Sequence, residues 1–416
     1  MRASYRSWQF RVLLATIIGY ALFYFVRANI PMAMPSMIKS LGVNKEHIGR
    51  ILTLFGLMYG LAKFANGYFG DRANARAMMV VGLAGSAAMN LCFGLSSSVW
   101  LLGIVWLLNG WFQGMGFPPC ARLMTHWFSP KELATKMSWW NISHQLGGGL
   151  VAVLCGVLLA AQFGWRACFI VPAGIALLGA WYLWHHLPDT PPSVGLPEVE
   201  GTHHASGEQT ADEFRVFVRK RVFLNKYVWL VSISNFFVYT IRYSVFNWGP
   251  TMLTEAKHVH IVKASYMVAS FEWSGLAGGL VSGWLTDRFF GGRAMRVGTF
   301  FMAMAGLSVY LLWKMPGGNE WTSLLLFGST GFFIYGPQCL VSIAAANLAT
   351  KRAAATAVGL TSIFGYGSTL LSGWGVGALV DACGWDAVFK CLLVVAGVGV
   401  VVFAVCWPAK AHGYDD

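Results

Sequence analysis

Long apolar segments recur along the whole chain, and this feature restricts its fold more than any other. A membrane-crossing helix needs about 20 mostly apolar residues, and segments of that kind occur six times before residue 188 and six times after residue 225. They cover residues 9–37, 49–69, 78–97, 99–119, 137–161 and 165–187, then 226–252, 264–285, 296–315, 321–346, 354–380 and 385–407. The sequence therefore predicts an all-α polytopic membrane protein with 12 transmembrane helices.

The composition agrees with a membrane protein and argues against several other classes. Charged residues make up 11% of the chain, whereas a soluble domain carries roughly 25%. The net charge of +13 falls between the apolar segments rather than on one solvated face, so we expect no nucleic-acid partner. The eight cysteines follow no metal-ligand spacing, and the sequence contains no P-loop or similar enzyme signature. We therefore expect neither enzyme activity nor a cofactor or metal.

The placement of lysine and arginine predicts the orientation in the membrane. Cytoplasmic connections between membrane helices carry an excess of these residues. They concentrate on one side of the predicted helices, at Arg2, Arg6, Arg11, Arg72, Arg76, Arg122, Lys131, Lys136, Arg215, Arg219, Lys220, Arg221, Arg288, Arg293, Arg296, Lys351 and Arg352. We therefore expect both termini in the cytoplasm. The location that we expect is a bacterial inner membrane, with the first helix retained.

Four sequence matches relate the first half of the chain to the second in one register. The pairs are Tyr24-Phe-Val-Arg27 with Tyr239-Thr-Ile-Arg242, Asp71-Arg72 with Asp287-Arg288, Pro119 with Pro337, and Gly164-Trp165 with Gly384-Trp385, at offsets of 215, 216, 218 and 220. Repeats of six spans in the same order indicate two halves related by an axis along the membrane normal. We predict two pseudo-symmetric six-helix halves, 1–187 and 226–416, joined by a cytoplasmic linker, 188–225.

Two arginines lie inside apolar segments, where a charge costs from about 2.5 to over 10 kcal/mol. On each segment the spacing i, i+4, i+7 gathers three polar side chains on one helix face: Tyr20, Tyr24 and Arg27 on the first, Asn235, Tyr239 and Arg242 on the seventh. The alternative is that each arginine reaches the interface within an aromatic belt, but Arg27 lies about 24 Å beyond Arg11 along a helix. Guanidinium suits bidentate recognition of phosphate or carboxylate. We therefore predict an anion-binding site.

Three other titratable residues also lie within apolar segments. Lys63 shares a helix face with Tyr59, and we predict either a contribution to anion binding or a structural pair with Glu272. Glu272 itself is expected to neutralise an arginine or lysine when substrate is absent. His144 shares a face with Asn141 and precedes three glycines that permit close helix approach. Its ordinary pKa of about 6.5 suits an anion whose second pKa is about 6, although a lone histidine can also be a core residue.

With these residues in view, the chain resembles the major facilitator superfamily. The Gly-x-x-x-Asp-Arg sequences that contain Asp71, Arg72, Asp287 and Arg288 are similar to its signature, and we expect these charges to hold one conformation at cytoplasmic helix ends. More narrowly, the chain resembles the organophosphate:phosphate antiporters, which include glycerol-3-phosphate, hexose-6-phosphate and phosphoglycerate transporters and a sugar-phosphate sensor. This resemblance is carried by residues 19–27, 111–120, 140–144, 237–242 and 333–337.

The resemblance implies that Arg27 and Arg242 clasp the phosphate of the substrate. It implies that further residues line the cavity: Tyr20, Tyr24, Tyr59, Lys63, Asn141, His144, Tyr239, Glu272, Tyr335 and Tyr366. The implied activity is the exchange of a small organophosphate for inorganic phosphate by rocker-switch alternating access. We expect the monomer to be the functional unit.

The organic part of the substrate is less constrained. Val358 and Thr361 stand where the hexose-phosphate branch carries an Asp and a Lys, which favours a compound similar to glycerol 3-phosphate. Ala28, Phe117 and Asn247 depart from the family pattern, so another sugar phosphate stays open. The alternatives in kind are a transporter-like membrane sensor of sugar phosphate and a superfamily transporter of another organic anion.

Overall fold

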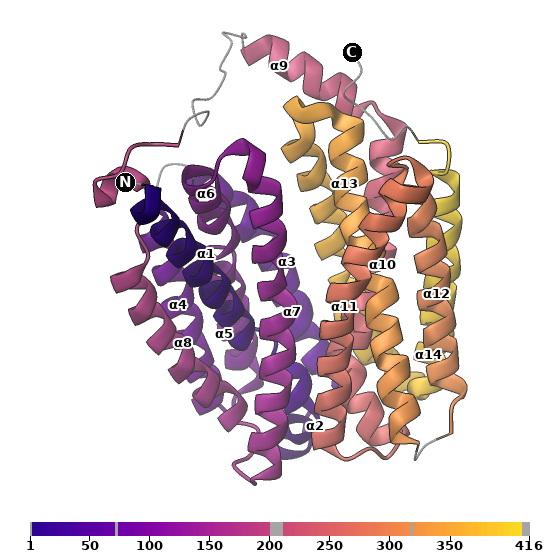
Figure 1. The fold of residues 1–416 in the computed structure, drawn as a ribbon. Coiled ribbons are helices and arrows are strands. Elements are labelled where there is room, and N and C mark those ends of the chain that lie inside the picture. The colour runs from indigo at the N-terminus through magenta and orange to yellow at the C-terminus, as the bar shows by residue number, and fades with distance from the viewer. Residues whose placement is uncertain (1, 71–73, 200–210, 317–318, 410–416) are drawn as a thin grey trace. The chain divides into compact units, whose positions relative to one another are not determined.

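Helices dominate the described part of the chain, which covers residues 2–70, 74–199, 211–316 and 319–409 of a computed structural model (Figure 1). No β-strand occurs in those ranges. The predicted apolar segments are largely helical there, although 9–37 is interrupted at residues 26–29 and 99–119 at residues 114–116, and the all-α prediction is confirmed. By length and composition, seven helical stretches of these ranges are apolar enough to cross a membrane, the longest being Thr356–Val405 with 50 residues.

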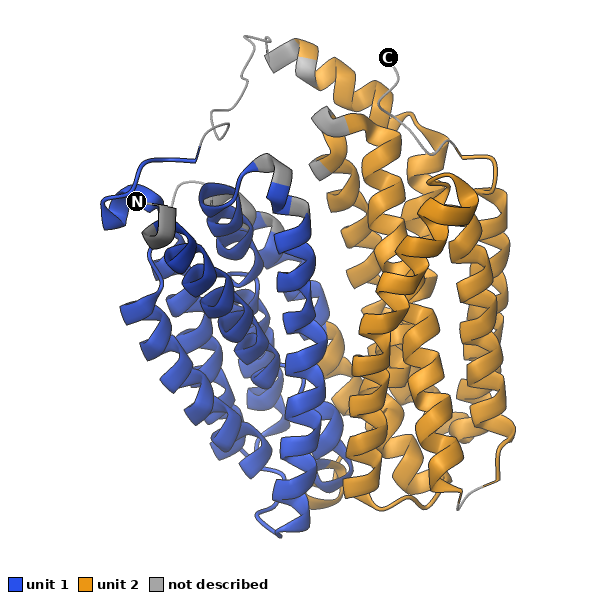
Figure 2. Cartoon of the chain, viewed as in Figure 1, with its two compact units in different colours: residues 1–37, 54–206 blue, residues 38–53, 207–416 orange. Residues whose placement is uncertain are grey.

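The chain forms two compact units (Figure 2). The first consists of Met1–Met37 and Leu54–Ser206, and the second of Ile38–Thr53 and Gly207–Asp416. Residues 38–53 thus belong to the second unit, although they precede the predicted linker in the sequence. The predicted division into two six-helix halves and a linker stays a prediction, and the units are described separately below.

In the first unit, eight helices follow one another along the chain. They are α1 (Arg2–Phe25), α2 (Ile30–Leu41), α3 (Lys45–Gly70), α4 (Ala75–Leu95), α5 (Val99–Gln113), α6 (Phe117–Trp127), α7 (Pro130–Ala160) and α8 (Ala167–His186), of which α2 and α3 each extend into the second unit. Helix α1 packs against α7 and α8, and α4 packs against α5 and α8 (Figure 1). The short 3₁₀ helix Pro191–Val194 follows α8.

Helices α1 and α7 approach each other closely at Gly147. A Cβ atom built on Gly147 lies 2.4 Å from the carbonyl oxygen of Ala21 and 2.8 Å from Cβ of Tyr24. Only glycine fits such a contact, and small residues commonly allow membrane helices to pack backbone against backbone. This approach brings the part of α7 that carries His144 against the tyrosine face of α1.

The second unit contains the remaining helices. They are α9 (Ala211–Val218), a π-helical turn (Arg219–Phe223), α10 (Lys226–Ala256), α11 (Ile261–Phe290), α12 (Ala294–Lys314), α13 (Glu320–Gly367), a second π-helical stretch (Leu370–Gly375) and α14 (Val376–Val405). Helix α13 packs against α10, α11 and α12, and α14 packs against α10 and α12. Non-helical residues interrupt α13 and α14, at Thr350 with φ 67° and at Gly384 with φ 78°. These interruptions separate the tenth, eleventh and twelfth predicted segments.

Two glycines bring α11 and α13 into backbone contact. A Cβ atom on Gly278 of α11 lies 1.9 Å from the carbonyl oxygen of Phe332, and one on Gly331 of α13 lies 2.0 Å from that of Phe271. The two contacts are reciprocal, and they are seven residues apart on α11. They fix the register between the helices that carry Glu272 and Tyr335.

Residues 45–53, the first turns of α3, pack within the second unit against its last helices. The Thr53 hydroxyl donates to the carbonyl of Thr369 (2.7 Å) and accepts from the backbone N–H of Trp374 (2.9 Å). A Cβ atom on Gly49 lies 2.5 Å from the carbonyl oxygen of Gly373, so the two backbones touch. Charged side chains add to these contacts, including the ion pair between the partly buried Lys45 and the exposed Glu255 (3.2 Å).

Candidate functional site

Arg27 lies where the first apolar segment is interrupted. Helix α1 ends at Phe25 and α2 begins at Ile30, whereas the sequence pattern predicted one continuous span over 9–37. Pro31 follows the break; proline lacks an N–H group and is favoured in the first turn of a helix. The apolar pattern runs across the break without a gap, which explains why periodicity did not reveal it.

Amide side chains from α4 and α5 donate hydrogen bonds to the backbone carbonyls at this break. Asn90 and Asn109 both donate to the carbonyl of Val26, at 2.7 and 2.9 Å, and Gln113 donates to that of Phe23 at 3.0 Å. A carbonyl left without a partner inside a membrane protein costs several kcal/mol. The three buried amides therefore stabilise the irregular backbone that holds Arg27.

Aromatic rings surround the Arg27 guanidinium. Its Cζ lies 3.8 Å from the ring centroid of Tyr24 and 5.1 Å from that of Tyr59. Both tyrosines are buried, whereas Arg27 is half-buried. A cation over the face of an aromatic ring is stabilised by the ring quadrupole, and more strongly where water is excluded. The planar fork of a guanidinium suits carboxylate or phosphate, so Arg27 is the candidate for an anionic ligand in this cluster.

His144 and Tyr20 extend the same cluster. The His144 ring lies 4.7 Å from that of Tyr20 and 5.5 Å from that of Tyr24, centroid to centroid. Its Nδ1 is 2.8 Å from the carbonyl oxygen of Asn141, which leaves Nε2 on the far side of the ring. The predicted face of α1 and His144 are therefore brought together. Asn141 enters this arrangement through its backbone carbonyl, and the residue as a whole is exposed.

Lys63, the other candidate cation of the site in this unit, lies on α3. Its Nζ is 4.7 Å from the ring centroid of Phe117, and that ring in turn lies 5.6 Å from Trp140. Trp140 packs on Tyr20 at 4.8 Å, so the aromatic contacts run without interruption from Lys63 to the Tyr20 face. The ring that Lys63 contacts thus belongs to Phe117, one of the residues that depart from the family pattern.

In the second unit, Arg242 is buried and is part of a hydrogen-bonded chain. Its Nη2 donates to the hydroxyl of Tyr335 (2.9 Å), and that hydroxyl donates to Oε2 of Glu272 (2.6 Å). Glu272 is 1% exposed and Arg242 is 7% exposed. Buried charges need partners of this kind, because an uncompensated one is strongly destabilising. Glu272 is thus linked to Arg242 through the hydroxyl of Tyr335, and its predicted role of neutralising an arginine or lysine stays a prediction.

Tyrosines also surround Arg242, as they surround Arg27. Its Cζ lies 4.6, 5.2 and 5.8 Å from the ring centroids of Tyr335, Tyr243 and Tyr239. Tyr239 meets Tyr366 edge to face at 5.8 Å. Unlike the first helix, α10 is continuous through its arginine, from Lys226 to Ala256. The two Tyr-x-x-Arg faces therefore have similar side-chain contacts, but the backbone is broken at Arg27 and helical at Arg242.

Other predicted residues lie elsewhere or outside the described ranges. Asp287 and Arg288 are exposed in the last turns of α11. Asp71 and Arg72 lie outside the described residues, and their predicted role stays a prediction. The sequence reasoning did not single out Asn90, Asn109 and Gln113, although isolated amides within apolar helices were a visible signal.

Comparisons with known proteins identify the family. Residues 16–373 match the Major Facilitator Superfamily. A solved structure of a bacterial homologue of the human lysosomal transporter Spinster, in an inward-facing and occupied conformation, superposes with a TM-score of 0.75 over 98% of this chain and 97% of its own, at 16% identity. That likeness concerns the fold. The chain belongs to the major facilitator superfamily.

Curated relatives narrow the comparison. The glycerol-3-phosphate transporter of Bacillus subtilis is 36% identical over 98% of this chain and 94% of its own. The probable hexose phosphate transport protein of Chlamydia pneumoniae is 36% identical over 98% and 93%. The membrane sensor protein UhpC of Escherichia coli is also 36% identical, over 96% and 92%. These relatives agree with the resemblance to the organophosphate:phosphate antiporters drawn from the sequence.

Proposed function

We propose that this protein exchanges a small organophosphate for inorganic phosphate across the membrane by rocker-switch alternating access. The observation that carries the proposal is the pair of Tyr-x-x-Arg helix faces, one in each unit, with each guanidinium lying against tyrosine rings. Arg27 and Arg242 both supply N–H donors suited to phosphate. Two relatives are named as transporters of glycerol 3-phosphate and of hexose phosphate, and these names support the same substrate class.

Exchange requires that a bound phosphate can leave, and the second unit contains groups suited to this step. Glu272 is linked to Arg242 through the hydroxyl of Tyr335. A phosphate that binds Arg242 must do so in the field of this carboxylate, which weakens binding and favours release. His144 and Lys63 occur only in the first unit, so they give the site an asymmetry with which to select the organic part. Tyr20, Tyr59, Asn141 and Tyr366 complete the proposed lining.

The direct test is exchange in proteoliposomes loaded with labelled phosphate. Glycerol 3-phosphate, 3-phosphoglycerate and glucose 6-phosphate are added outside in turn, and the release of label is followed. We expect release with at least one of them, and the largest rate with a short substrate such as glycerol 3-phosphate. Release with a simple organic carboxylate and with none of the phosphate esters would instead identify a transporter of another organic anion.

A membrane sensor is the second candidate, and one observation favours it. UhpC of Escherichia coli, whose name describes a membrane sensor, is as similar in sequence as the transporters are. A sensor would bind sugar phosphate in detergent solution but would release little label in the exchange assay. Titration calorimetry and the exchange assay on the same preparation together separate the two functions, because a transporter gives both binding and release of label whereas a sensor gives binding alone.

The proposal includes the placement of the protein in the membrane. The termini and the 188–225 linker lie in the cytoplasm of a bacterial cell, and the monomer is the working unit without enzyme activity or a nucleic-acid partner. The Asp71-Arg72 and Asp287-Arg288 pairs hold the inner helix ends in one of the alternating conformations. Support comes from the concentration of lysine and arginine on one side of the chain.

A further inference from the structure

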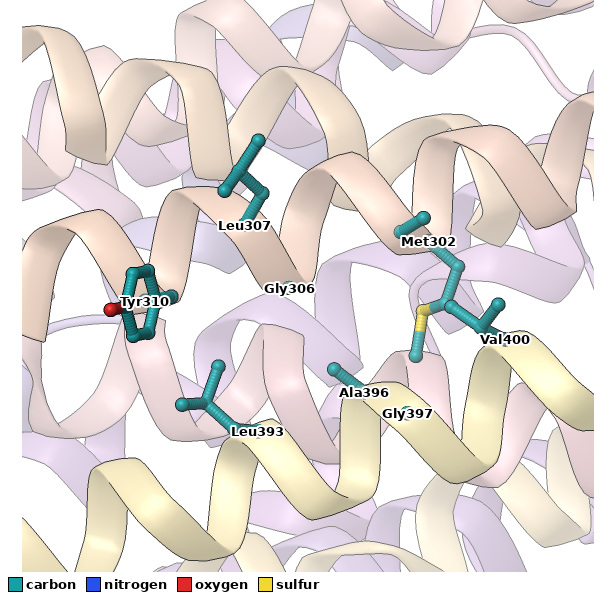
Figure 3. Close-up of a pocket in the computed structure, with 9 residues that line it drawn as sticks. Met302, Gly306, Leu307, Tyr310, Leu393, Ala396, Gly397 and Val400 are labelled. Atoms are coloured by element: carbon teal, nitrogen blue, oxygen red, sulfur yellow. The ribbon is translucent and has the colours of Figure 1, made fainter.

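An apolar groove lies between α12 and α14 in the second unit, away from the arginine site (Figure 3). Its volume is about 260 Å³, and the residues that line it are Met302, Ala303, Gly306, Leu307, Tyr310, Leu393, Ala396, Gly397 and Val400. Leu307 and Tyr310 are 45% and 42% exposed, so the groove opens on the surface of the unit. Open space lies at Gly397, where an added Cβ would touch nothing within 4 Å, whereas one on Gly306 would meet Cβ of Ala396 at 3.0 Å.

Beyond the groove, the same two segments of the chain lead to one pair of side chains. On α12, lining residues 303, 307 and 310 share a face with residue 296 at helical spacing, and on α14 lining residues 393, 397 and 400 share a face; residue 407 follows two positions after the end of α14 at Val405. Arg296 and Trp407 are in contact. The guanidinium Cζ lies 5.3 Å from the indole ring, and Nε donates to the Trp407 carbonyl at 3.4 Å.

Charge differs between the two ends of the groove. At the Arg296 end the helices carry two basic residues, Arg293 and Arg296, both accessible and with no carboxylate in the first two turns of α12. At the other end, Asp386 accepts from the indole of Trp313 (2.8 Å), and Nζ of Lys314 lies 3.9 Å from the same ring. The ring of Trp313 lies 6.3 Å from that of Tyr310, which lines the groove (Figure 3).

We propose that the groove binds one acyl chain of an anionic phospholipid, with the headgroup phosphate at Arg293 and Arg296. The lining of α12 begins about 9 Å and ends about 21 Å along the helix axis from Arg296. That range lies within a hydrocarbon core about 30 Å thick. Interfacial Trp and Arg residues are suited to headgroup level, and each basic residue near an anionic surface adds to lipid binding. The site is independent of what the protein transports.

Native mass spectrometry of the purified full chain tests this proposal. Phosphatidylglycerol and phosphatidylcholine of equal chain length are added in turn, and the lipids retained per protein are counted. We expect one phosphatidylglycerol to be retained in preference to phosphatidylcholine. The Arg296→Gln variant should weaken retention about fivefold, which corresponds to the loss of one basic contact.

Filling the groove provides the second variant. Gly397→Phe should abolish the retained phosphatidylglycerol, because its side chain occupies the cavity. Val398→Phe, on the exposed side of the same helix, and Arg11→Gln, which removes an arginine that lies over Trp8, are the matched controls and should retain it. Equal retention of both lipids, or retention unchanged in Gly397→Phe, would overturn the proposal. So would a dimer that Gly397→Phe dissociates, because the groove would then hold a second copy of the chain.

Discussion

Replacing Glu272 with glutamine tests how the second unit tunes anion binding, on the basis of the proposed phosphate exchange. The two hydrogen bonds through Tyr335, 2.9 and 2.6 Å long, place the carboxylate near the Arg242 guanidinium. A phosphate oxygen bound on the other side of that guanidinium, at about 2.8 Å from it, lies about 8 Å from the carboxylate. At an effective dielectric constant of about 20, two unit charges at that distance repel by about 2 kcal/mol.

We therefore expect Glu272→Gln to bind inorganic phosphate about 30-fold more tightly. Exchange should become slower at saturating phosphate, because release then limits the cycle. Titration calorimetry of the detergent-solubilised protein measures the first effect, and exchange in proteoliposomes measures the second. Glutamine keeps the size of the side chain and can still accept from Tyr335, but it removes the carboxylate from the chain that leads to the buried Arg242, so we expect a lower thermal midpoint and measure it beside the affinity.

Glu320→Gln is the matched control for this experiment. Glu320 lies in the same unit and pairs with Lys263 at 2.6 Å, with both side chains about half exposed. Exposed pairs contribute little, and remote ones are screened by salt. Phosphate affinity should therefore stay within about twofold of the wild type. Unchanged or weaker phosphate binding in Glu272→Gln would refute the reasoning, because the carboxylate would then not act on an anion at Arg242.

Three more predictions concern the remaining features. Arg27→Lys should abolish phosphate exchange in proteoliposomes with normal membrane insertion, since lysine lacks the bidentate fork; retained exchange would refute the clasp. Gly278→Ala should destabilise the protein by about 1–3 kcal/mol through overpacking against α13, seen as a lower thermal midpoint, whereas Gly174→Ala, which meets nothing within 4 Å, should not. The indole of Trp374 and then a neighbouring arginine lower the pKa of Glu46, outside the apolar segment. Its stabilising effect is therefore present at neutral pH and is lost as pH falls through this lowered pKa, so the midpoint difference between wild type and Glu46→Gln should vanish in acid.

Much of the fold could be predicted from the sequence. The length of each apolar segment and the matches between the two halves can both be seen in the sequence without knowing how the helices pack. The polar faces with Arg27 and Arg242 followed from helical spacing and from the 215-residue offset. Both arginines do meet the tyrosines of their own faces in the structure. Local spacing is enough for such contacts, because residues four or seven positions apart lie on one side of any helix.

Contacts between helices were harder to predict. Asn90 and Asn109 appeared in the sequence as isolated polar residues within apolar helices, and nothing in their spacing indicates that both meet the carbonyl of Val26. Only the family resemblance predicted that Tyr335 lines the cavity. Its place between Arg242 and Glu272 depends on the register of α11 and α13, which the glycine contacts set. A tertiary register of this kind leaves no periodic trace in the sequence.

Helix α3 is continuous from Lys45 to Gly70, yet its first turns belong to one compact unit and the rest to the other. A continuous helix is stiff. If one unit moves relative to the other, α3 must either bend near Thr53 or lose the contacts of its first turns with the second unit. That end is held by two hydrogen bonds through the Thr53 hydroxyl, the Gly49 contact and the ion pair of Lys45. The same turns also carry Ile48 and Ile51, which are 1% and 3% exposed, so release of that end would uncover apolar side chains as well as break hydrogen bonds.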